Sequence, residues 1–182
     1  KEGNHVGIAA DLIKLISQRT GLKIRLVKTS TFEESLVLSK RKECDILSFL
    51  NKTPDRTKWL IFTDTLLTDP NVIITRVGYP FIGQLNSLKN VSMALPKGTM
   101  MYEFINKDFP LIKVIPSINE TESMKKVSEN KVDMTIRSLM TAAYDIKKNK
   151  LYNLKISGQT IGYSNNLSLA VNKDEVILRN IL

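Results

Sequence analysis

Arg56 is the first residue whose type and position suggest binding chemistry. The run 44–50 is short and mostly apolar, which is typical of a strand covered on both faces. The motif Thr-Pro-Asp-Arg (53–56) follows that run directly. Arg56 is therefore expected at the carboxyl end of a strand, where a guanidinium can hold a carboxylate through two parallel hydrogen bonds. The alternative is a surface arginine that pairs with Asp55 or Glu34.

A second candidate site comes at Gly98 and Thr99, between an expected strand and an expected helix. Gly98 lets the backbone approach a ligand closely. Thr99 and the free N–H groups of the first helical turn can hold an anion, although ordinary helix capping would use the same residues. The adjacent Met100 and, earlier in the chain, Phe32 at a helix start either line a pocket or pack in a core.

The composition lacks the residues that several other kinds of site require. The 182 residues include one cysteine, Cys44, and one histidine, His5. An intramolecular disulfide, a Cys/His metal site and a histidine-based catalytic triad are therefore not expected. The acids near helix starts suit the helix dipole, and nothing singles out a nucleophile or an acid–base pair. We expect a protein that is not an enzyme and that needs no cofactor or metal.

The positive charge indicates a solvated basic surface, and the alternative is a field that attracts a small anionic ligand. The net charge is +9, but the lysines are scattered among acids and show no alternation with aromatic residues. Nucleic-acid binding is therefore not expected, because it needs a basic patch with stacking platforms. No apolar stretch is long enough for a membrane span. The first residues read as a turn without a leader, so any signal peptide or anchor is expected upstream of the given sequence.

Two blocks of alternating helix and strand organise the chain. Apolar spacing and capping residues predict the first block as helix 8–20, strand 22–27, helix 31–42 and strand 44–50. The second block comprises strands 90–95, 111–116 and 132–136 with helices 99–107, 120–130 and 138–148. Such alternation is typical of parallel βαβ units.

Two further extended runs, at 71–76 and 167–172, bracket the second block. They indicate a two-lobed α/β protein whose chain crosses twice between the lobes. Lobe one is expected to comprise residues 1–74 plus 168–182, and lobe two residues 75–167. In such a protein a ligand is expected in the cleft at the carboxyl ends of the strands.

The order of several short motifs resembles family 3 of the bacterial extracellular solute-binding proteins. The motifs are Gly3 and Gly7 before Ile-Ala-Ala-Asp-Leu (8–12), Thr-Gly-Leu (20–22), Cys-Asp-Ile-Leu (44–47), Thr-Pro-Asp-Arg (53–56), Leu-Ile-Phe-Thr (60–63), Lys-Gly-Thr (97–99), Lys-Val-Asp (131–133) and Leu-Ala-Val (169–171). The resemblance covers nearly the whole chain. It implies a periplasmic-binding-protein type II clamshell on the periplasmic or extracellular side of a bacterial membrane. The family's first strand has no counterpart here, so lobe one is expected to lack it or to receive it from elsewhere.

The resemblance also implies roles for individual residues. Arg56 matches the arginine that holds an α-carboxylate, and Phe32 matches an aromatic platform over the ligand. The remaining matches are polar contacts at Ser48 and Asn51 and the start of a lobe-two helix at Gly98, Thr99 and Met100.

Ser138 departs from the family pattern. Amino-acid-binding members place an acid for the α-amino group where this chain has Ser138. A serine cannot neutralise an ammonium group, and burying that charge without a partner costs several kcal/mol. The expected ligand is therefore a small carboxylate or an amino-acid-like anion, unless the lobe binds nothing tightly.

The amino-acid sequences of the motifs are most similar to those in the sensor domains of histidine kinases and diguanylate cyclases. We therefore expect a ligand-sensing domain tethered to a membrane receptor through segments outside this sequence. The main alternative is a solute-binding protein of an ABC importer for polar amino acids or organic acids. An enzyme similar to cyclohexadienyl dehydratase is a third possibility, and it would require a catalytic acid in the cleft.

Overall fold

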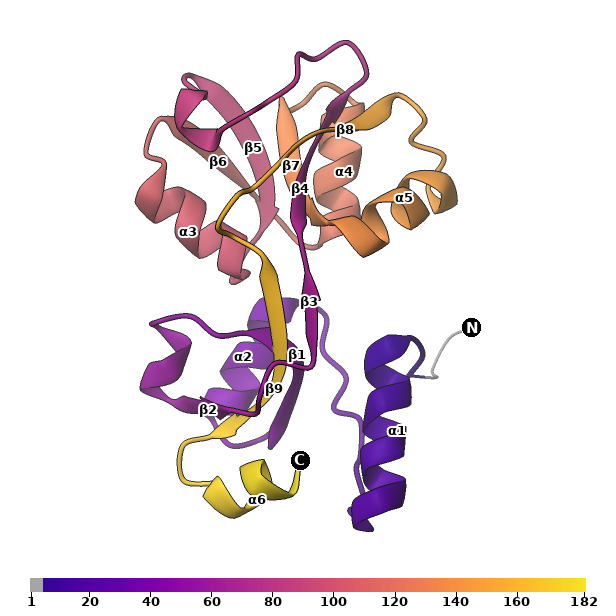
Figure 1. Ribbon diagram of the computed structural model, residues 1–182, viewed down its shortest axis with the longest axis vertical. Helices are drawn as coiled ribbons and strands as arrows, with labels where there is room; N and C mark the ends of the chain where they lie inside the picture. The colour runs from indigo at the N-terminus through magenta and orange to yellow at the C-terminus, as the bar shows by residue number, and fades with distance from the viewer. Residues whose placement is uncertain (1–4) are drawn as a thin grey trace. The chain divides into compact units, whose positions relative to one another are not determined.

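A computed structural model describes residues 5–182 as two compact units, each with its own β-sheet (Figure 1). Unit 1 contains residues up to Ser30, Glu34–Leu67 and Asn166–Leu182, and unit 2 contains Thr31–Glu33 and Thr68–Asn165. Gly3 of the family motif and the expected turn at 1–4 lie outside the described residues. The lobe boundaries expected at 74/75 and 167/168 stay a prediction, because these units reflect packing whereas lobes are defined by independent movement.

Unit 1 is built on a small antiparallel sheet. Its strands are β1 (Ile46–Asn51), β2 (Leu60–Phe62) and the long β9 (Asn165–Asn172), which pairs with both and with β3 (Leu67–Asp69). The helical elements are α1 (Ile8–Thr20), α2 (Phe32–Lys40), the 3₁₀ turn η1 (Arg56–Lys58) and α6 (Val176–Ile181). Gly21 ends α1 with φ 75°, a left-handed conformation that glycine adopts without steric cost.

The strand expected at 22–27 is wrong. The segment carries the predicted apolar alternation, yet the structure assigns it no strand, and Leu26 is 48% exposed. A strand exists only where a neighbour accepts its backbone hydrogen bonds, and within the described residues the sheet of unit 1 ends at β1, which pairs only with β9. The first block is therefore not the parallel βαβ unit that its alternation of helix and strand patterns predicted.

The order of helices and strands in unit 2 agrees closely with the prediction. Its helices are α3 (Met100–Asp108), α4 (Glu120–Ser128) and α5 (Leu139–Lys148), with the 3₁₀ turn η2 (Leu85–Ser87) before them. Its strands are β4 (Asn71–Arg76), β5 (Val91–Pro96), β6 (Ile112–Ser117), β7 (Met134–Ser138) and β8 (Leu154–Gln159), in the order β6-β5-β7-β4-β8. β5 is parallel to β6 and β7, whereas β4 is antiparallel to β7 and β8. The sequence analysis did not predict β8.

Apolar clusters cover both faces of this sheet. On β4, Ile73 belongs to a buried cluster with residues of α3, whereas Val72 and Ile74 belong to a second cluster with residues of α4 and α5. Successive side chains of a strand point to opposite faces. The helix α3 therefore covers one face of the sheet, and α4 and α5 cover the other, as Figure 1 shows.

Candidate ligand-binding site

Three helices of unit 2 begin at one edge of its sheet. The neighbouring parallel strands β6, β5 and β7 end at Ser117, Pro96 and Ser138, and α4, α3 and α5 start within a few residues of these ends. Parallel strands bring their carboxyl ends to the same edge, which is where open α/β sheets bind ligands. The first N–H groups of each helix point toward this edge and favour negative charge there.

Gly98 and Thr99 shape the start of α3. Gly98 has φ +79°, which L-residues with a side chain rarely adopt. The Thr99 hydroxyl donates to the Pro96 carbonyl over 2.8 Å and accepts from the Tyr102 N–H over 3.3 Å, so it caps the helix. Met100 is buried in the apolar cluster on the α3 face. Ligand contacts from these residues stay predictions.

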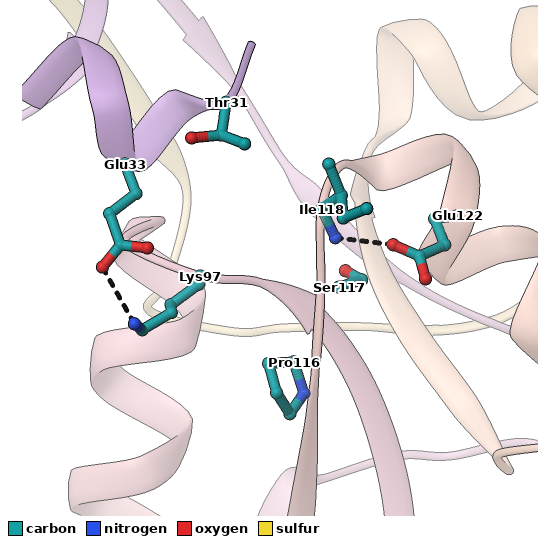
Figure 2. A pocket seen from close by; sticks show the side chains of 7 residues that line it. All are labelled: Thr31, Glu33, Lys97, Pro116, Ser117, Ile118 and Glu122. Carbon is teal, nitrogen blue, oxygen red and sulfur yellow. Dashed lines mark hydrogen bonds and ion pairs between the residues drawn. The ribbon is translucent and has the colours of Figure 1, made fainter.

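A cavity of about 270 Å³ lies beside this turn (Figure 2). Its lining residues all belong to unit 2. They are Thr31, Glu33, Lys97, Pro116, Ser117, Ile118 and Glu122. None of them was singled out as a site residue from the sequence, although Lys97 opens the recognised Lys-Gly-Thr motif. Phe32, the expected aromatic platform, lies between two of these residues in the chain and is half-buried, but it is not part of the lining.

Ion pairs and backbone donors hold the charged groups of the cavity. The Lys97 ammonium lies 3.0 Å from the Glu33 carboxylate, which raises the pKa of Lys97. The Glu122 carboxylate accepts from the Ile118 N–H over 2.6 Å and from Lys126 over 3.1 Å, and both contacts lower the pKa of Glu122. Figure 2 shows Glu33 turned to Lys97 and Glu122 turned to the Ile118 N–H. A solute that enters this cavity meets one lysine and two glutamates.

A bulge in unit 1 lies at the expected polar contacts. β1 pairs with β9 through Leu47 and Ala170 and again through Leu50 and Ser168, which leaves one extra residue on β1. Phe49, within this bulge, has φ +51°, a conformation that costs a bulky residue about 1–3 kcal/mol. Such bulges redirect side chains and are frequent next to binding sites. Sequence reasoning missed Phe49, because neither strand pattern nor composition signals a bulge.

Arg56 is buried at the start of η1. Its side chain is 3% exposed, and its Nη1 donates to the Asn51 carbonyl over 2.7 Å. The amide oxygen of Asn51 also accepts from the Asn166 N–H over 2.8 Å. The structure therefore brings Arg56 and Asn51 together, with Ser48 on the same strand. The surface position in the alternative is wrong, whereas a pairing of Arg56 with Asp55 or Glu34 stays a prediction.

Ser138 contacts an acid that the sequence analysis did not consider. Its hydroxyl donates to the carboxylate of Asp69, which lies at the end of β3, and the Met140 N–H donates to the same carboxylate over 3.3 Å. Asp69 is 2% exposed. A sequence signal for this contact is lacking, because 69 residues separate the two side chains in the chain.

The family model of bacterial extracellular solute-binding proteins, family 3, matches residues 1–180. The chain belongs to this family. Family members are extracytoplasmic binding domains and in general not catalysts. The two-sheet arrangement agrees with the periplasmic-binding-protein type II fold of solved relatives.

Similar proteins include both sensors and a solute-binding protein. The virulence sensor protein BvgS of Bordetella pertussis is 23% identical over 176 residues, which cover 97% of this chain and 14% of BvgS. The arginine-bound form of ArgBP from T. maritima is 25% identical with a TM-score of 0.86, covering all of this chain and 84% of that structure. A histidine kinase sensor domain with similarity to periplasmic binding proteins is 18% identical with a TM-score of 0.87, covering 96% of this chain and 76% of that domain. This solute-binding clamshell is thus similar to sensor-kinase domains, and it spans a small part of a curated sensor.

The described part of the chain shows neither a cluster of metal ligands nor a membrane-spanning helix. Between residues 5 and 182, no three or more His, Cys, Asp or Glu side chains gather where they could hold a metal ion. No helix in the same range is both long and apolar enough to cross a bilayer.

Proposed function

We propose that this chain is the extracytoplasmic ligand-sensing domain of a membrane-anchored signalling receptor. The ligand is a small carboxylate or an amino-acid-like anion, and its binding shifts the population between open and closed forms of the clamshell. The main support is that BvgS, a sensor protein, matches this chain over 97% of its length.

The position of Arg56 supports an anionic ligand. The Arg56 side chain is 3% exposed, and an arginine is rarely buried to this extent in a folded chain. Its bond to the Asn51 carbonyl orients the side chain next to the bulged strand that carries Ser48. In unit 2, Gly98, Thr99 and the N-terminus of α3 are a separate group of donors that suits an anion.

A solute-binding protein of an ABC importer is the second candidate function. The similarity to ArgBP, whose arginine-bound structure is known, favours it. The two candidates have the same ligand site and differ in what the protein acts on. In the first, ligand changes the output of an attached receptor; in the second, the ligand-bound protein delivers solute to a permease.

A ligand screen followed by a signalling assay tests the proposal. The purified chain is first heated with amino acids, dicarboxylates and aromatic acids, and at least one compound is expected to raise the Tm. That compound is then added to cells that carry the full-length receptor and a transcriptional reporter. A change of reporter output with unchanged solute uptake supports the sensor. Uptake that depends on this protein, with unchanged output, supports the importer, and no Tm rise with any compound contradicts both.

The dehydratase alternative is tested separately with prephenate and arogenate. Incubation with the purified chain is expected to leave the absorbance of both substrates unchanged. A protein-dependent change in absorbance would instead support an enzyme.

A further inference from the structure

The most unusual charged group in unit 2 is the Asp69 carboxylate. The side chain is 2% exposed, and its donors are the Ser138 hydroxyl and the Met140 N–H. Within residues 5–182, no lysine, arginine or histidine forms an ion pair with it. An isolated buried carboxylate is costly, and buried acids are ordinarily paired with a cation.

Asp145 shows what a paired acid looks like in the same unit. Its carboxylate accepts from Nε and Nη2 of Arg137 over 2.8 and 2.5 Å, and the two side chains are 11% and 17% exposed. The buried acid on α5 thus has an arginine, whereas the buried acid at the end of β3 has two dipolar donors. The start of α5 compensates part of the Asp69 charge, but a helix terminus contributes only about half an elementary charge.

The Asp69 carboxylate can accept more than its two bonds. An ionised carboxylate offers about four acceptor sites on its two oxygens. The remaining sites suit an ammonium group, which has three donors and a full positive charge. Ser138, which holds the Asp69 carboxylate, ends β7, and the strand next to β7 is β5, which leads to the N-terminus of α3 and so to a site that favours a carboxylate. Adjacent strands lie roughly 4.8 Å apart, so a zwitterion at the end of β7 can reach both Asp69 and the start of α3.

We propose that Asp69 binds the ammonium group of the ligand and so makes this domain specific for amino acids over amine-free acids. This inference rests on the proposed ligand-binding function. It revises the expectation drawn from Ser138, because the negative charge missing at the end of β7 is supplied from β3. Ser138 then acts as a positioning residue that holds the Asp69 carboxylate.

A paired ligand panel tests the inference by calorimetry. The panel contains the twenty L-amino acids and, for each, the matching acid without the α-amino group, such as glutarate for L-glutamate and succinate for L-aspartate. The wild-type chain is expected to bind one amino acid at least about 100-fold more tightly than its amine-free partner, because a desolvated charge pair is worth several kcal/mol. Asp69→Asn is expected to remove most of that preference and to leave the affinity for the amine-free acid within about threefold.

Two further variants separate binding from folding. Ser138→Ala removes one donor and keeps the carboxylate, so the preference for the amino acid is expected to remain above tenfold. Asp69→Asn keeps an acceptor for the Met140 N–H and loses the unpaired charge, so the Tm without ligand is expected to rise. Asp145→Asn is the matched control at a buried acid and is expected to lower the Tm without changing the preference.

The outcomes distinguish this inference from the proposed function. If the wild-type chain binds only amine-free acids, or if Asp69→Asn keeps the full preference for the amino acid, the role of Asp69 is refuted while ligand binding stands. If the wild-type chain binds no member of the panel, the proposed function fails and the inference fails with it. A lower Tm of Asp69→Asn with an unchanged preference would show that Asp69 only caps α5.

Discussion

Replacement of Arg56 by alanine is expected to weaken carboxylate binding strongly. The guanidinium is 3% exposed, so a contact between it and a ligand is shielded from water. Removing one partner of such a buried charged contact costs about 2–4 kcal/mol. At 1.4 kcal/mol per tenfold, the Kd of the bound carboxylate rises by about 30- to 700-fold.

The same substitution also affects folding. The Arg56 side chain donates to the Asn51 carbonyl over 2.7 Å, and a hydrogen bond from a charged donor contributes about 1.5–3 kcal/mol. A chain of this size loses about 2–4 °C of Tm per kcal/mol, so a decrease of about 3–12 °C is expected. Circular dichroism should first show that the variant is folded. The calorimetric titrations are then run at a temperature well below its Tm.

Two companion variants make the calorimetric test specific. Arg56→Lys keeps the charge but not the two-pronged geometry, so its affinity is expected to lie between those of wild type and Arg56→Ala. Lys58→Ala removes an exposed cation from the same 3₁₀ turn, where its ammonium pairs with Asp55 over 2.5 Å, and its affinity is expected to match wild type. A folded Arg56→Ala that binds as tightly as wild type would refute the assignment.

Three other predictions concern stability. Asp145→Asn removes the nearer of the two carboxylates of Arg137 and leaves Glu120 at 3.6 Å, so it is expected to lower the free energy of unfolding by about 1.5–3 kcal/mol in urea titrations. Gly158→Ala places a Cβ 2.2 Å from the Ile82 carbonyl oxygen, so a clear decrease in Tm is expected, and an unchanged Tm would contradict the packing. The lowered pKa of Glu122 means that its contacts stabilise the fold above the unfolded pKa, and that this contribution is lost as pH falls through the folded pKa. Glu122→Gln is therefore expected to lower the Tm at pH 7 and to have a smaller effect near pH 3, as scanning calorimetry can measure.

Much of unit 2 could be predicted from local sequence. The helices α3 and α4 start next to Thr99 and Asn119, whose side chains accept from backbone N–H groups three residues later. Such caps depend only on near neighbours in the chain, so the residue types are sufficient evidence. Apolar spacing and Gly21 are local signals too, and they predicted α1 with its observed bounds, Ile8–Thr20.

Strand pairing was less predictable, because it depends on distant segments. The alternation at 22–27 is as regular as that of a strand, yet the segment has no ladder partner in the structure. β1 pairs with β9 over more than 110 residues of chain and contains a bulge at Phe49. Apolar periodicity reports which side of a segment is buried, but not which strand accepts its hydrogen bonds.

The sequence by itself determined the family, most of the order of helices and strands, and the choice of Arg56 as a candidate ligand-binding residue. These depend on residue types and their order. Only the tertiary structure showed that Arg56 is buried and that Asp69 lies against Ser138. The physical reason is that burial and charge compensation are properties of neighbours in space. The carboxylate that contacts Ser138 belongs to a residue 69 positions away in the chain, and folding alone brings the two together.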